Sequence, residues 1–197
     1  MKQSLLLELI YPLPAATLGF ELLVFLGSIY FKKLNITFIT LLFLASRILF
    51  IFMDFQQAHA YISLFSPIVF AILLTLKKDY LSTKRLIPAY LVVLFYILIG
   101  IFTKDYQFIS YLHNLNFINL TYVYSDFSFC LFLILMIYVV ILRKIKNFEC
   151  FLQGAYIAAY FQFIFYNSLQ FYNLSYFELG SFIFLAAIGY QGYKLAF

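Results

Sequence analysis

The sequence predicts an all-α fold, a single polytopic bundle of about seven transmembrane helices. Hydrophobic residues occupy 65% of the 197 positions and charged residues 11%, whereas an average soluble domain is about 25% charged. The apolar residues arrive in continuous blocks of about 17 to 25 residues, long enough for a helix to cross a hydrocarbon core of about 30 Å. Because these blocks do not alternate between apolar and polar residues, they favour helices over membrane strands.

Charged residues mark the ends of the first four predicted spans. Lys32 ends the first, Asp54 the second, Lys77 the third and Lys104 the fourth. A charged side chain at the centre of a bilayer costs about 3 kcal/mol, so the chain is expected to leave the apolar layer at these positions. The four spans cover residues 11–31, 35–53, 60–76 and 86–103.

The remaining three spans follow the same rule. The fifth begins at Asp126 and ends before Arg143, the sixth begins after Asn147 and ends before Asn167, and the seventh contains Glu178 near its start. They cover residues 126–142, 148–166 and 177–196, and with the first four they make one transmembrane domain of residues 1–197.

Basic residues predict how the bundle is oriented. Lys and Arg near span ends accumulate on the cytoplasmic side, and ten of the 13 basic residues fall on one side of the predicted topology. The N-terminus is therefore predicted outside and the C-terminus in the cytoplasm. Phe and Tyr are abundant and Trp is absent, a composition typical of an AT-rich bacterial genome, so the predicted location is the bacterial inner membrane. The ten residues are Lys32, Lys33, Lys77, Lys78, Lys84, Arg85, Arg143, Lys144, Lys146 and Lys194.

Residues 104–125 are the ambiguous stretch, aromatic in composition but carrying His113 and several asparagines. As an eighth span, this stretch would place the basic segment 143–146 opposite the basic segment 77–85 and break the charge rule. It is therefore predicted to be an external loop or an interfacial helix.

Two opposite charges within neighbouring spans form the first candidate site. Glu21 lies about midway along the first span and Arg47 lies in the second, so an ion pair facing the bundle interior would remove two isolated charges from lipid. Asp54 is the alternative partner for Arg47. The pair has two interpretations, a structural tie between helices or part of a ligand-binding site.

The sixth span supplies the second candidate site. Small residues in it allow close helix packing, and amide side chains can hydrogen-bond across such a contact, so packing is the default interpretation. A ligand pocket between the sixth and seventh spans is the alternative. Its lining would be Gln162, Tyr166 and Gln170, and the small residues are Gly154, Ala155, Ala158 and Ala159.

Other chemistry is not indicated. His59 and His113 fall on the predicted external side, where they would be solvated or hydrogen-bonded loop residues, or sensors of acidity. Two histidines far apart in sequence do not make a metal site, which needs three or four ligands.

Cys130 and Cys150 lack metal-ligand spacing, and no catalytic motif is found. No catalytic residue, metal or cofactor is predicted, and the positive charge is explained by orientation in the membrane rather than by nucleic acid.

The last ten residues leave the seventh span on the predicted cytoplasmic side. Residues 193–197, Tyr-Lys-Leu-Ala-Phe, resemble the connector after which many bacterial diguanylate cyclases begin their GGDEF domain. Segments 26–35 and 75–86 are similar to parts of the multi-helix sensor regions attached to those cyclases. The resemblance implies that an output domain making cyclic di-GMP from two GTP molecules follows, and none of the family's catalytic residues lies within this chain.

The sequence therefore predicts a sensory or signal-input membrane module. Its expected partners are the lipid bilayer, a second copy of the chain in a homodimer, and an unidentified small-molecule or membrane stimulus. The seventh helix would pass the signal on, with Gly189 and Gly192 as soft points near its exit. The alternative is a small-solute transporter, or the substrate-binding membrane subunit of one, in which Pro67 and Pro88 would break helices.

Overall fold

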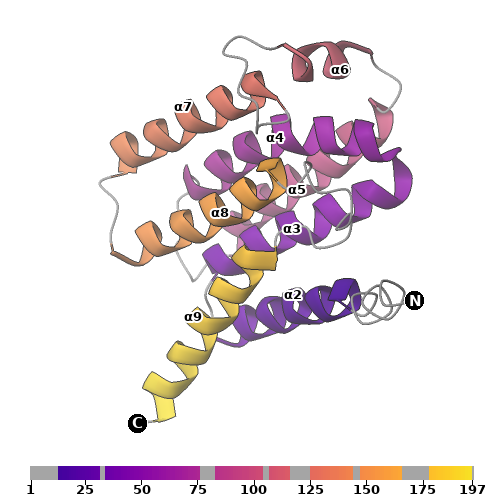
Figure 1. The fold of residues 1–197 in the computed structure, drawn as a ribbon. Coiled ribbons are helices and arrows are strands. Elements are labelled where there is room, and N and C mark those ends of the chain that lie inside the picture. The colour runs from indigo at the N-terminus through magenta and orange to yellow at the C-terminus, as the bar shows by residue number, and fades with distance from the viewer. Residues whose placement is uncertain are drawn as a thin grey trace, which may run out of the picture.

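The computed structural model describes residues 13–31, 34–75, 83–103, 107–115, 125–143, 147–165 and 178–196 (Figure 1). Over these ranges the fold is all-α, as the sequence predicts. The helices are α2 (Leu13–Tyr30), α3 (Leu34–Phe52), α4 (Phe55–Thr75), α5 (Thr83–Phe102), α6 (Gln107–His113), α7 (Asp126–Arg143), α8 (Asn147–Phe165) and α9 (Glu178–Ala196).

Seven of these helices coincide in sequence with the seven predicted spans. The largest difference is in α4, which begins at Phe55 where a start at residue 60 was predicted. The eighth helix, α6, falls in the ambiguous stretch 104–125. Its seven residues extend for about 10 Å at 1.5 Å per residue, which is a third of the hydrocarbon thickness of a bilayer.

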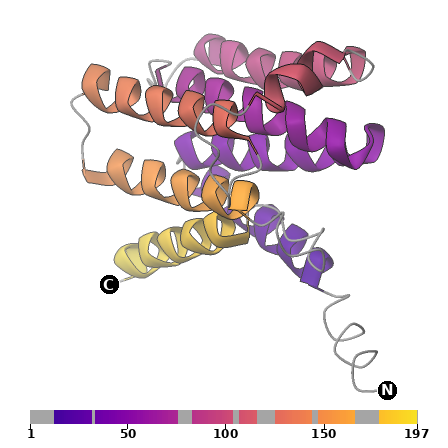
Figure 2. The ribbon, with the colours of Figure 1, turned by 45° about the horizontal axis from the view of Figure 1, so that its top comes forward.

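Two helices, α3 and α4, lie at the centre of the bundle. α3 packs against α2, α4, α5 and α8, and α4 packs also against α5, α6, α7 and α8. α9 packs against α2 and α8. Figures 1 and 2 show α2 and α9 at one edge of the bundle, with the C-terminus of α9 at its periphery. The last helix is therefore attached to the others mainly through two neighbours.

The interior between α4, α7 and α8 is aromatic. Phe70 of α4 stacks on Tyr156 of α8 with ring centroids 3.7 Å apart, and Phe132 of α7 stacks on Tyr160 of α8 at 4.1 Å. All four rings are almost completely buried. Such pairs contribute about 0.5–1.5 kcal/mol each beyond the burial of their surface, so they fix α8 against its neighbours.

The outward faces of the peripheral helices are apolar. Leu23 of α2 is 58% exposed, Phe95 of α5 56% and Ile141 of α7 72%, and other large apolar side chains on the same helices are exposed as well. Many of the polar side chains that the structure describes are buried instead. Those that are buried include Glu21, Ser28, Thr37, Thr40, Ser46, His59, Ser63, Ser66, Ser128 and Ser181.

Length and composition alone single out one segment of the described chain as long and apolar enough to cross a membrane. That segment is Gln56–Thr75 of α4, and most of it is buried in the bundle. Shorter apolar segments lie in α2, α3, α5, α7 and α9.

Candidate functional site

Glu21 joins three helices in the interior of the bundle. The Arg47 Nε atom of α3 donates a hydrogen bond to Glu21 Oε2 on α2 at 2.6 Å, and the Ser181 hydroxyl of α9 donates to Glu21 Oε1 at 3.4 Å. We call these three residues the polar junction. The predicted ion pair between Glu21 and Arg47 is thus confirmed, whereas Asp54, the alternative partner, is exposed just before α4.

Burial makes the polar junction sensitive to any change in its partners. The Glu21 side chain is completely buried, and the Arg47 side chain is 15% exposed. A carboxylate taken out of water is retained only when a positive charge and hydrogen-bond donors replace its hydration. Arg47 and Ser181 supply both, so the position of α9 is coupled to the ion pair between α2 and α3.

Small residues bring α9 close to the neighbouring helices beside the junction. A Cβ atom built on Gly180 would lie 2.6 Å from the Ala159 Cβ and 3.1 Å from the Ala155 carbonyl oxygen of α8. A Cβ atom on Gly27 of α2 would lie 2.9 Å from Ile188 of α9. Two of the small residues of the sixth predicted span therefore serve in helix packing, as the default interpretation holds.

The predicted ligand pocket between the sixth and seventh spans is not tested. Gln162 belongs to α8, but its side chain is not among those the structure describes, and Tyr166 and Gln170 lie outside the described residues. The pocket stays a prediction from sequence.

A second polar cluster surrounds Pro67 in α4. Proline has no N–H, so it leaves the carbonyl four residues earlier, that of Ser63, without its helical donor. Tyr160 of α8 replaces that donor: its hydroxyl lies 2.7 Å from the Ser63 carbonyl oxygen and 3.2 Å from that of Ser128 in α7. The Ser63 hydroxyl lies 3.2 Å from the Ser128 hydroxyl and 3.1 Å from His113 Nδ1 in α6. The turn of α4 that Pro67 interrupts is therefore hydrogen-bonded to α6, α7 and α8.

The two histidines lie together beside this cluster. Their ring centroids are 5.7 Å apart, and both side chains are buried. His59 also stacks on the Phe163 ring at 4.4 Å, and its Nε2 lies 3.3 Å from the Phe163 carbonyl oxygen. The expectation of solvated loop histidines is therefore wrong, because His59 packs against Phe163 of α8 and His113 packs against Ser63 and His59 of α4. Among the described residues, no group of three or more His, Cys, Asp or Glu is placed to hold a metal ion.

Acidification is expected to loosen α6. Burial, and secondarily the neighbouring His59, lowers the pKa of His113 from 6.5 to about 3. Because the docked helix holds the neutral imidazole and the released helix takes up a proton, docking is fully stable above about pH 6.5 and loses up to about 1.4 kcal/mol per pH unit below it. Two helices pack against α6: α4, which carries His59, and α7. The acidic residue of α7 is Asp126, which is buried in its first turn.

Hydrogen exchange measures this effect. Protection factors of the 107–113 amides, corrected for intrinsic exchange rates, should fall between pH 7 and pH 5 in the wild-type protein. In His113→Gln they should be independent of pH over that range. The same pH dependence in both proteins would show that another group controls the docking of α6.

Comparisons with protein-family models, with curated proteins and with solved structures give no match to this chain.

Proposed function

We propose that this chain is a multi-pass protein of the bacterial inner membrane that receives a signal within the bilayer and passes it to the cytoplasm through α9. The distribution of polarity supports the membrane location. The exposed faces of α2, α5 and α7 carry large apolar side chains, whereas Glu21, Asp126 and most of the described serine hydroxyls are buried. Helix interfaces in membranes use buried small and polar residues, and lipid covers the apolar exterior.

Helix length is consistent with this location. The seven long helices contain 18 to 21 residues, which corresponds to about 27 to 32 Å at 1.5 Å per residue. A hydrocarbon core is about 30 Å thick. Seven crossings with the basic segments inside would leave the N-terminus outside and the C-terminus of α9 in the cytoplasm.

The observation that carries the signalling role is the contact between the polar junction and the last helix. Glu21 holds Arg47 with one carboxylate oxygen and Ser181 of α9 with the other. A change in the packing of α2 against α3 therefore alters the site at which α9 is held. A stimulus that shifts such a two-state equilibrium from 1:99 to 99:1 must favour one state by about 5.5 kcal/mol. Breaking a buried ion pair costs about 3–5 kcal/mol, so the junction would supply most of that difference.

The proposed output is synthesis of cyclic di-GMP. The support for it is the resemblance of segments 26–35, 75–86 and 193–197 to the sensor regions of diguanylate cyclases. A cytoplasmic end of α9 agrees with it, because GTP, the substrate of such an output domain, is cytoplasmic.

A chimera tests the coupling. A diguanylate cyclase catalytic domain is fused after Phe197, and cyclic di-GMP is measured in cells at equal membrane abundance. Ser181→Ala removes one hydrogen bond to Glu21. A hydrogen bond contributes about 0.5–1.5 kcal/mol, so the cyclic di-GMP level should change by about two- to tenfold. The matched variant Ser46→Ala removes a buried hydroxyl that contacts Tyr96 of α5, and it should leave the level near that of the wild type.

Equal levels in both variants and the wild type would contradict coupling through the junction. Uptake of a solute by liposomes that contain only this chain would favour the transporter instead.

A further inference from the structure

His113 lies where α6 attaches to the bundle. It is buried, its Nδ1 atom lies 3.1 Å from the Ser63 hydroxyl of α4, and its ring centroid lies 5.7 Å from that of His59. α6 packs against α4 and α7, and the acidic residue of α7 is Asp126. A positive charge on His113 would therefore be buried beside a second imidazole, and α6 keeps its contacts only while His113 is neutral.

The same part of α4 also holds α8. The His59 ring stacks on Phe163 of α8 with centroids 4.4 Å apart, and the Tyr160 hydroxyl of α8 donates to the Ser63 carbonyl oxygen at 2.7 Å. Ser63 thus contacts α6 through its hydroxyl and α8 through its carbonyl. Because both helices meet at these residues of α4, the release of α6 removes a contact from the residues to which α8 is attached.

Another face of α8 lies against α9. Ala159 follows directly before Tyr160, and a Cβ atom built on Gly180 of α9 would lie 2.6 Å from the Ala159 Cβ. Ser181, the next residue of α9, donates a hydrogen bond to Glu21 in the polar junction. A displacement of α8 at Tyr160 therefore reaches the junction through two successive residues of α9.

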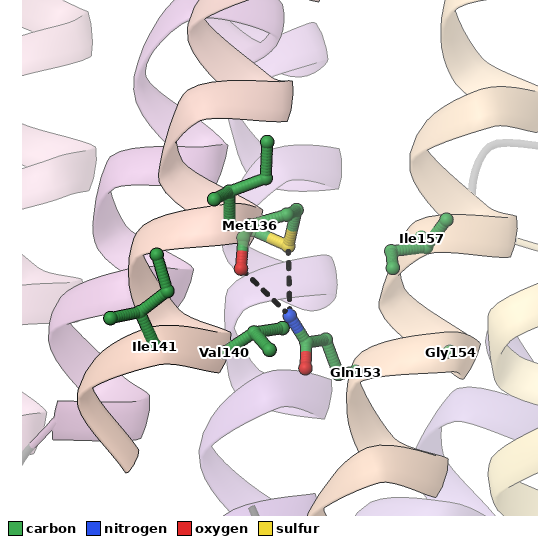
Figure 3. Close-up of a pocket in the computed structure, with 7 residues that line it drawn as sticks. Met136, Val140, Ile141, Gln153, Gly154 and Ile157 are labelled. Carbon is green, nitrogen blue, oxygen red and sulfur yellow. Dashed lines mark hydrogen bonds between the residues drawn. The ribbon is translucent and has the colours of Figure 1, made fainter. Parts of the chain in front are cut away.

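A groove of about 370 Å³ gives α8 room to move against α7 (Figure 3). Gln153 Nε2 crosses from α8 to donate to the Met136 carbonyl oxygen of α7 at 3.2 Å, as Figure 3 shows. A Cβ atom built on Gly154, in the groove wall, would have no other heavy atom within 4 Å. Because close-packed side chains resist displacement, this open side is the direction in which α8 can shift.

We propose that acidity on the outer side of the membrane is the stimulus of this bundle: protonation of His113 releases α6 from α4, and α8 carries the change to α9. This proposal rests on the proposed function and on its topology, which places α6 outside. Imidazole suits such a stimulus because its charge changes between about pH 5 and 8. The element with two states is α6, docked or released, and a proton favours the released state because it binds there more tightly.

The size of the response follows from the change in the pKa of His113, from 6.5 in the released helix to about 3 in the docked one. Linkage between protonation and docking makes the docking equilibrium constant about 25-fold smaller at pH 5 than at pH 7. A change of that size moves a population from about 5:1 in favour of the docked helix to about 1:5.

A distance measured by electron paramagnetic resonance on the full chain in lipid nanodiscs tests the proposal. Spin labels are attached to Ile87→Cys in α5 and Tyr190→Cys in α9, both at exposed positions, in a background with Cys130 and Cys150 replaced by alanine. Between pH 7 and pH 5 a second distance between α5 and α9 should gain population relative to the first by up to about 25-fold. Hydrogen exchange of the 107–113 amides in the same protein reports the release of α6.

His113→Gln keeps a polar side chain that takes up no proton, and it should abolish the pH dependence of the distance. Asp54→Asn is the matched control, since it removes an exposed acidic group on the same predicted side, and its distance should respond to pH as in the parent. A response that persists in His113→Gln would overturn the proposal. In the parent protein itself, release of α6 at pH 5 with an unchanged distance would overturn it as well.

The cyclic di-GMP chimera separates the two ways of failing. If the distance does not respond to pH while Ser181→Ala still changes the cyclic di-GMP level, acidity is refuted as the stimulus and the signalling role stands. If the distance responds to pH while Ser181→Ala leaves the cyclic di-GMP level unchanged, the signalling role is refuted and the acid-driven movement of α9 stands.

Discussion

Replacing Arg47 with methionine should destabilise the protein by about 3–5 kcal/mol, the cost of leaving a buried charge without its partner. Glu21 is completely buried and receives its 2.6 Å hydrogen bond from Arg47. In the variant, the carboxylate loses its charged donor at 2.6 Å and keeps the Ser181 hydroxyl, which lies 3.4 Å from Glu21 Oε1. Unfolding of the purified protein by a denaturing detergent, followed by circular dichroism, measures the loss.

The double variant Arg47→Met with Glu21→Met distinguishes the loss of the whole ion pair from the cost of leaving one buried charge without a partner. Replacing both members of a buried ion pair with apolar residues is often neutral or stabilising, so the double variant should recover most of the stability that the single variant loses. A double variant as unstable as Arg47→Met alone would show that the ion pair does not account for the loss.

Gly180→Ala should separate α9 from α8 and destabilise the protein by about 1–3 kcal/mol. The added methyl group would meet the Ala159 Cβ at 2.6 Å and the Ala155 carbonyl oxygen at 3.1 Å. Backbone atoms of α8 cannot turn aside as a flexible side chain can, so the helices must move apart. The same detergent unfolding, with Tyr-based near-ultraviolet circular dichroism as a probe of packing, measures the change.

Gly189→Ala is the matched control, since its added methyl group would meet nothing within 4 Å. It should be neutral or stabilise α9 by up to about 1 kcal/mol through helix propensity. Ala159→Gly combined with Gly180→Ala should restore part of the stability by making room for the new methyl group. If Gly180→Ala were more stable than the wild type, close packing at this position would not be what holds α9.

The helix boundaries could be read from the sequence because breaks in hydropathy coincide with helix ends. The exception is α4, which begins at Phe55 rather than at residue 60. Gln56, Gln57 and His59 end the apolar run there, but a helix satisfies its own backbone whatever its side chains are. The packing of His59 on Phe163 stabilises this turn, and a hydropathy pattern cannot register a contact between residues so far apart in sequence.

The ion pair of the polar junction was predictable from the sequence because both of its members are charged. Glu21 and Arg47 are opposite charges at similar depths of neighbouring spans, and a lone charge in an apolar environment requires a partner. Ser181 gave no such signal, because a serine in a membrane helix can satisfy its own hydroxyl on the preceding turn. Its part in the junction follows only from the packing of α9 on α2.

For the cluster around Pro67, the sequence indicated which carbonyl lacks a donor but not which residue supplies one. A proline inside an apolar span indicates that the carbonyl four residues earlier, here that of Ser63, needs another donor. Which residue supplies that donor depends on how α8 packs against α4, and 97 positions separate Ser63 from Tyr160. The pairing of His59 with His113 depends in the same way on where α6 docks.

Labelling of single cysteines tests the central claim, that this bundle crosses the membrane with the C-terminal end of α9 inside. In a background with Cys130 and Cys150 replaced by alanine, Tyr111→Cys in α6 and Tyr193→Cys in α9 both place the thiol at an exposed position. A maleimide that cannot cross membranes should modify Tyr111→Cys in intact spheroplasts, and Tyr193→Cys only after the cells are opened. Modification of Tyr193→Cys in intact spheroplasts would contradict the topology.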